Sequence, residues 1–136
     1  MVGVLRAVAP VVSVIAMNSI GSYVSARGAG LACPDWPLCP LVMDELVLLE
    51  FAHRAFALVV LVAVVAVLIP SMRIGGTARK LAVTGVILLV VQIAIGGAMV
   101  LSALRPELVA LHMASASSVL AVFAMLAAHL IFGGRG

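Results

Sequence analysis

Four long apolar stretches dominate this sequence and decide which kind of fold it can adopt. They cover about residues 7–24, 47–69, 81–101 and 108–132, and each approaches the roughly 20 residues that a helix needs to cross a bilayer. Hydrophobic residues make up 65% of the chain and charged residues 10%, which leaves too few polar groups for the surface of a water-soluble domain. Strand-like alternation is absent, and helices satisfy their own backbone polar groups in lipid. The sequence therefore predicts an all-α integral membrane protein, a four-transmembrane-helix bundle forming a single domain over residues 1–136.

The charges between the apolar stretches predict the orientation of this bundle. With four spans, one side of the membrane holds only basic residues: Arg6, Arg73, Arg79, Lys80 and Arg135. The other side holds the loop 25–46 and the turn 102–107, where acidic residues outnumber basic ones. Because basic segments stay in the cytoplasm, we expect both termini to be cytoplasmic and the protein to lie in the plasma membrane. The net charge of +3 then reflects topology, and no nucleic-acid partner is expected.

The predicted external loop contains both cysteines of the chain, Cys33 and Cys39, with Pro34 and Pro37 between them. Disulfides can form outside the cytoplasm. The pair therefore predicts either a disulfide that fixes the loop over the end of the bundle or a redox-active pair. A zinc site is not expected, because two thiolates without a nearby histidine fall short of the usual four ligands.

Ionisable side chains within the apolar stretches are costly unless they are paired or functional. Glu50, His53 and Arg54 are three and four residues apart, so they share one face of the second helix. His112 lies at a similar depth in the fourth helix, and two such histidines can bind one metal centre from opposite sides of a bundle. Arg54 can meet a haem propionate, pair with Glu50 or extend to the interface. His129 lies roughly 25 Å further along the helix and is expected at the inner interface.

Small and polar residues on the third and fourth helices agree with a site between helices. Gly85, Gln92 and Gly96 recur at helical spacing, and Ser115 and Ala116 follow His112 by about one turn. Small residues often indicate only close helix contact. A flat macrocycle also needs small residues beside its ligands, and both interpretations remain open.

Three motifs together resemble those of the haem A synthases, membrane enzymes that supply haem A to cytochrome oxidases. Residues 28–39, with the cysteine pair, resemble the first external loop of that family, and residues 50–54 resemble its Glu-x-x-His-Arg motif. Residues 92–97 and 105–112 resemble its third helix and the start of its fourth. Most members have eight helices in two similar halves, and this chain resembles the N-terminal half, with Pro40 where a glycine is common.

This resemblance implies an oxidoreductase, a haem A synthase that oxidises a ring methyl group of haem O to the formyl group of haem A. It implies that His53 and His112 are the axial ligands of a haem iron, either of haem b or of the substrate haem O. It also implies that Glu50 is a catalytic carboxylate near the reacting methyl group. Cys33 and Cys39 would lie above the haem edge as a disulfide or a redox pair.

One histidine pair per chain predicts one haem, so a reaction between a substrate haem and a cofactor haem requires at least two chains. We therefore expect a homo-oligomer, a dimer or trimer, with haem O synthase and cytochrome oxidase as candidate protein partners. Two other classes remain open. One is a b-type haem protein that transfers electrons or carries haem, and the other is a quinone-linked disulfide oxidase, which would need a second cysteine pair.

Overall fold

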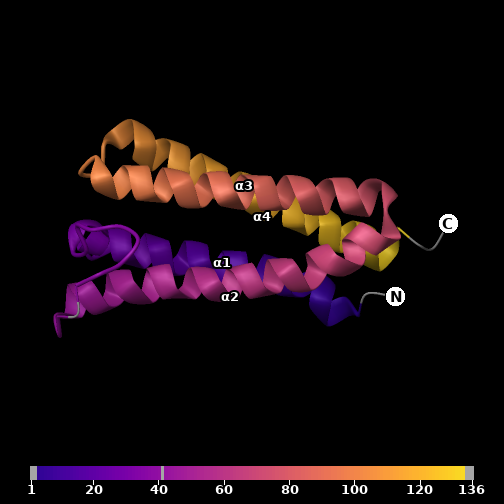
Figure 1. Ribbon diagram of the computed structural model, residues 1–136, viewed down its shortest axis with the longest axis horizontal. Helices are drawn as coiled ribbons and strands as arrows, with labels where there is room; N and C mark the ends of the chain where they lie inside the picture. The colour runs from indigo at the N-terminus through magenta and orange to yellow at the C-terminus, as the bar shows by residue number, and fades with distance from the viewer. Residues whose placement is uncertain (1–2, 41, 134–136) are drawn as a thin grey trace.

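Four long helices form the fold in a computed structural model, which describes residues 3–40 and 42–133 (Figure 1). They are α1 (Val4–Ala26), α2 (Glu45–Ile74), α3 (Gly76–Leu101) and α4 (Pro106–Phe132), and a short 3-10 turn, η1 (Ala29–Leu31), follows α1. Each of the four helices is long and apolar enough to cross a membrane. The prediction of an all-α bundle with four transmembrane helices is confirmed, and the chain is a multi-pass membrane protein.

The helices extend beyond the apolar stretches because local backbone chemistry, rather than hydrophobicity, determines where they end. Asp44 caps the start of α2, and its carboxylate accepts hydrogen bonds from the backbone N–H groups of Leu46 and Val47. The same helix continues past the apolar stretch through Pro70 and ends at Gly75, whose φ of 75° favours glycine. Gly75 alone connects α2 to α3.

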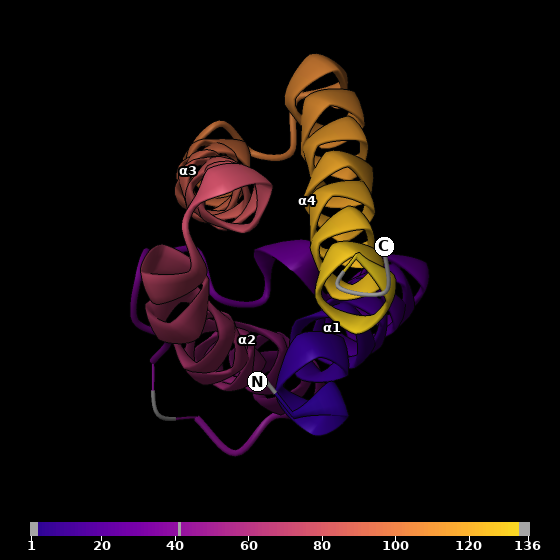
Figure 2. The same ribbon diagram turned by 90° about the vertical axis from the view of Figure 1, so that its right-hand side faces the viewer.

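The helices are arranged as a ring in which α1 contacts α2 and α4, and α3 also contacts α2 and α4. Figure 2 shows this arrangement along the bundle, with α2 and α4 diagonally opposite. The first turn of α1, the connection between α2 and α3 and the last turn of α4 lie at the same end of the bundle (Figure 1). Four of the five basic residues behind the predicted orientation are near this end, whereas Arg135 lies outside the described residues. The cytoplasmic location of this end stays a prediction.

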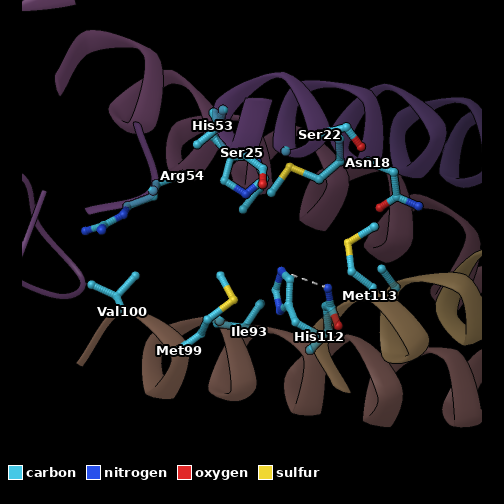
Figure 3. A pocket seen from close by; sticks show the side chains of 18 of the residues that line it. Asn18, Ser22, Ser25, His53, Arg54, Ile93, Met99, Val100, His112 and Met113 are labelled. Carbon is cyan, nitrogen blue, oxygen red and sulfur yellow. Dashed lines mark hydrogen bonds between the residues drawn. The ribbon is translucent and has the colours of Figure 1, made fainter. Parts of the chain in front are cut away.

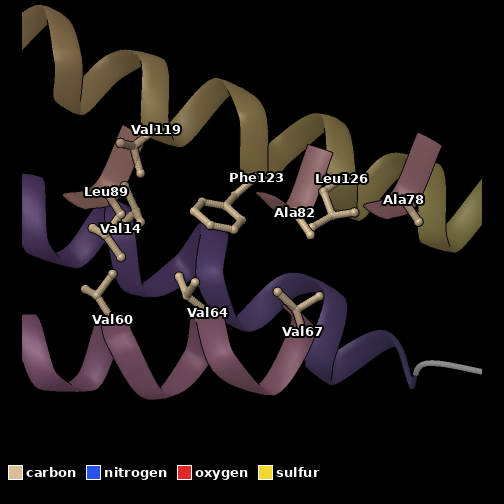
Figure 4. Packing of buried hydrophobic residues seen from close by; sticks show 10 residues of the cluster. All are labelled: Val14, Val60, Val64, Val67, Ala78, Ala82, Leu89, Val119, Phe123 and Leu126. Atoms are coloured by element: carbon tan, nitrogen blue, oxygen red, sulfur yellow. The ribbon is translucent and has the colours of Figure 1, made fainter. Parts of the chain in front are cut away.

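Tightly packed apolar side chains fill the half of the bundle nearest the two termini. At its centre is Phe123, which is 1% exposed. A Cβ atom at Gly85 would lie 2.7 Å from Cζ of the Phe123 ring, so α3 can approach this ring only because residue 85 is a glycine. Figure 4 shows how the four helices contribute to the cluster, whose buried members are Val14, Val60, Val64, Val67, Ala78, Ala82, Leu89, Val119, Phe123 and Leu126. The site lies in the other half.

Candidate haem-binding site

A cavity of about 410 Å³ occupies the half of the bundle opposite the termini. All four helices and the loop between α1 and α2 contribute to its walls. Its volume falls within the range of about 300–1,000 Å³ that is usual for sites of small molecules and cofactors. The apolar cluster closes the cavity toward the termini, and the loop lies over its other end.

His53 and His112 project into this cavity from α2 and α4, the two helices that lie diagonally opposite each other (Figure 3). The helix periodicity predicts that both histidines lie at a similar depth, and the structure places both in the wall of one cavity. Within the described residues, the Nδ1 atom of each ring is buried and has no hydrogen-bond partner. Figure 3 shows the two histidines on opposite sides of the cavity.

Each histidine ring lies against a glycine of the neighbouring helix. A Cβ atom at Gly21 of α1 would lie 2.9 Å from Cε1 of His53, and a Cβ atom at Gly96 of α3 would lie 3.1 Å from Cε1 of His112. The two helix pairs therefore present their histidines in the same way, each ring occupying space that only a glycine leaves free. Gly96 belongs to the pattern of small residues that the sequence places beside the predicted ligands.

The two histidines differ in their hydrogen bonding. The side-chain amide nitrogen of Gln92 lies 3.2 Å from Nε2 of His112, so the amide donates and the ring nitrogen accepts. The Oε1 atom of Gln92 is buried without a partner among the described residues. No hydrogen bond to His53 occurs in the described part of the chain. The ring of His112 is therefore held by a hydrogen bond from Gln92, whereas the ring of His53 forms no hydrogen bond with the described residues.

Arg54 points away from the centre of the cavity and holds the loop (Figure 3). Its Nε donates to Oε1 of Glu50 at 2.8 Å. Its terminal nitrogens donate to the backbone carbonyls of Asp35 at 2.6 Å, Cys33 at 2.8 Å and Leu38 at 3.4 Å. The ion pair with Glu50, one of the expected roles of Arg54, is therefore present. Contact with a haem propionate stays a prediction, as does a catalytic role for Glu50.

The loop between α1 and α2 lies over one end of the cavity, and its residues 33–39 form a compact lid. A disulfide joins Cys33 and Cys39, whose Cα atoms are 5.0 Å apart. Trp36, between the cysteines, lies over α3, where a Cβ atom at Gly97 would come within 2.9 Å of the indole ring. The cysteine pair was predicted to be either a disulfide or a redox pair, and no role was predicted for Trp36. The position of the single tryptophan between the two cysteines was the available signal.

His129 belongs to the last turn of α4 and is not part of the cavity wall. Its Nδ1 atom lies 3.0 Å from the position that a Cβ atom at Gly133 would take. His129 is thus separated from His53 and His112, and its substitution can serve as a control for substitutions of the two cavity histidines.

Comparison with known proteins gives one informative similarity. The chain is 33% identical over 134 residues to a protein named protoheme IX farnesyltransferase from Haloarcula marismortui. The match covers 94% of this chain but only 28% of that protein. No protein-family model and no solved structure matches the chain.

This similarity overturns the haem A synthase assignment. Protoheme IX farnesyltransferase makes haem O by transferring a farnesyl group, whereas a haem A synthase oxidises haem O, and the two are different families. The predicted family, the oxidation of haem O to haem A and the oxidoreductase class are therefore wrong. Short motifs around two histidines can indicate that ligands and room for a porphyrin are present. They do not indicate which reaction is performed on the porphyrin.

Proposed function

We propose that this membrane bundle binds one protohaem (haem b) between His53 and His112, and that it does so in the formation of haem O. The observation that carries the proposal is the pair of imidazole rings facing one cavity from diagonally opposite helices (Figure 3). The similarity to a protoheme IX farnesyltransferase supports protohaem as the occupant and supports farnesylation as the reaction served. The porphyrin is then a substrate rather than a resident cofactor.

The residues that line the cavity suit a porphyrin. Histidine nitrogen is the usual protein ligand of haem iron, and three of the four ring nitrogens of His53 and His112 form no hydrogen bond within the described residues. Gly21 and Gly96 leave room for the two rings. Apolar residues dominate the remaining wall, which favours a flat, largely apolar macrocycle.

Within this proposal, the chain's own residues hold the porphyrin and shield it from water. His53 and His112 would hold the iron, and the lid of residues 33–39 covers the end of the cavity. Glu50 fixes Arg54, and Arg54 fixes the lid, so we assign both residues a positioning role. The farnesyl donor is assigned to no residue of this chain, which spans 28% of its relative.

The expected homo-oligomer loses its original basis, because the need for two haems came from the reaction that is now overturned. A dimer or trimer, and contact with cytochrome oxidase, stay predictions. Haem O formation still implies contact with a farnesyl-transferring protein or domain, and we propose this partner for the chain.

Titration of the purified protein with ferric protohaem tests the site. Wild type should bind haem with a low-spin absorption spectrum, and His53→Ala and His112→Ala should each lose the haem or the low-spin form. His129→Ala is the matched control, because this histidine is on α4 but outside the cavity, and it should bind as wild type does. A low-spin spectrum that neither cavity variant alters would refute the site.

The link to haem O formation needs a separate experiment. The segment of the Haloarcula protein that matches this chain is deleted, and haems extracted from expressing cells are separated by chromatography. We expect the deletion to lower haem O and coexpression of this chain to restore it, with the His53→Ala/His112→Ala variant failing to do so. Unchanged haem O after the deletion would refute the role in farnesylation while leaving the haem site intact.

A further inference from the structure

The hydrogen bond between Gln92 and His112 has a consequence for how a haem could be bound. The amide nitrogen of Gln92 is 3.2 Å from Nε2 of His112, and both residues line the cavity. An imidazole nitrogen that accepts a hydrogen bond uses its lone pair for it. The same lone pair cannot bind an iron until the amide moves away.

Nε2 is the nitrogen of each histidine ring that faces the cavity. The Nδ1 atoms of both rings are buried and unpartnered within the described residues, so they face the protein. Nε2 of His53 is not among the buried unpartnered atoms and forms no hydrogen bond in the described part of the chain. His53 thus has a free Nε2 exposed to the cavity, whereas Nε2 of His112 is engaged.

We propose that Gln92 is a positioning residue that engages Nε2 of His112, so that His53 binds a haem iron first and His112 binds only when the amide turns away. This inference rests on the proposed haem site. It adds an order of ligand binding and a residue that controls it.

The surroundings of Gln92 favour a contact that can be exchanged. Its Oε1 atom is buried without a partner among residues 3–40 and 42–133, so the amide satisfies only part of its hydrogen-bonding capacity in this position, and such a group is costly to bury. The ring of His112 also lies against Gly96, about one turn along α3 from Gln92, where even a Cβ atom would come within 3.1 Å of the ring. The ring is therefore held in place, and the flexible glutamine side chain is the part that can move.

Two substitutions at Gln92 should shift the binding of His112 in opposite directions. Gln92→Met keeps a similar length and removes the donor, so the fraction of bound haem in the low-spin, two-histidine form should rise. The equilibrium between one-histidine and two-histidine ligation should shift roughly 2- to 13-fold, the range expected for the net contribution of one hydrogen bond. Gln92→Glu replaces the donor with an acceptor that favours a proton on Nε2 of His112, and the same equilibrium should shift the other way.

The experiment mixes purified protein with ferric protohaem in a stopped-flow instrument and follows the absorption spectrum from high spin to low spin. Wild type should show two phases, and the second, slower phase should be absent from His112→Ala. Gln92→Met should accelerate that second phase, Gln92→Glu should slow it, and neither should change the first phase. In a His112→Ala background both Gln92 substitutions should have no effect, which isolates the coupling between the two residues.

The outcomes separate this inference from the proposed function. If the protein binds no haem, the proposed site itself is refuted. If it binds haem with two histidines but Gln92→Met leaves the second phase unchanged or slows it, the inference is overturned, because Gln92 then does not oppose ligation by His112. Opposite shifts in the Met and Glu variants, both abolished by His112→Ala, support it.

Discussion

Replacing Arg54 with methionine should release the lid and destabilise the half of the bundle that contains the cavity. The guanidinium donates to Glu50 at 2.8 Å and to the carbonyls of Cys33 at 2.8 Å and Asp35 at 2.6 Å. Methionine keeps much of the apolar length of the side chain and removes every donor. The substitution thus tests the hydrogen bonds and the charge rather than the packing.

The expected magnitude follows from the burial of Glu50, which is 4% exposed. Removing one partner of a buried ion pair leaves the other charge uncompensated and costs about 3–5 kcal/mol. The pair between Arg27 and Glu45 is the matched control, because its length of 2.7 Å is similar but both side chains are exposed. Exposed ion pairs contribute little to stability, so Arg27→Met should hardly change the free energy of unfolding.

Unfolding by sodium dodecyl sulfate in mixed micelles, followed by the fluorescence of Trp36, measures this free energy. Trp36 is the single tryptophan of the chain, and it lies on the lid that Arg54 holds. The double variant Glu50→Gln/Arg54→Met should recover part of the stability lost in Arg54→Met, because no uncompensated charge stays buried. An Arg54→Met variant no less stable than Arg27→Met would refute the reasoning.

Three further outcomes are expected. Gly96→Val should lower the fraction of bound haem in the low-spin, two-histidine form while the bundle still forms, because even one Cβ atom comes within 3.1 Å of His112; the absorption spectrum of the bound haem measures this, and an unchanged low-spin fraction would contradict the geometry. Cys39→Ser should cost about 2 kcal/mol in the same unfolding assay, the chain-entropy contribution of a short closed loop, and a loss no greater than that of Arg27→Met would count against the disulfide. Reporter fusions at Gly76 should be cytoplasmic and fusions at Asp35 external, and the reverse pattern would contradict the orientation predicted from charge.

The helices could be predicted from the sequence because lipid imposes a minimum apolar length on each span. The ends of the helices could not, since they depend on the capping carboxylate of Asp44 and on the continuation of α2 through Pro70. The similar depth of His53 and His112 followed from helix count and rise per residue alone. That both rings line one cavity depends on how α2 and α4 are rotated about their axes, which apolar helices with little amphipathic pattern do not reveal.

The side-chain contacts within the site could not be predicted from the sequence. Gln92 was recognised as a polar residue on the third helix, but its hydrogen bond to His112 depends on side-chain rotamers across a helix interface. The packing of the Trp36 ring against Gly97 depends on the path of a loop, which the periodicity of apolar residues does not reveal. The reaction was wrongly predicted because histidine ligands and small neighbouring residues are requirements of porphyrin binding and are shared by proteins with different chemistry.

The most direct test of the central claim is the haem content per chain of the purified protein, combined with the electron paramagnetic resonance spectrum of the ferric form. The account predicts one haem per chain with a low-spin signal typical of two imidazole ligands, and conversion to a high-spin signal or loss of haem in His112→Ala. One haem per chain with an unchanged low-spin signal in both His53→Ala and His112→Ala would show that the iron is bound elsewhere, and it would contradict the account.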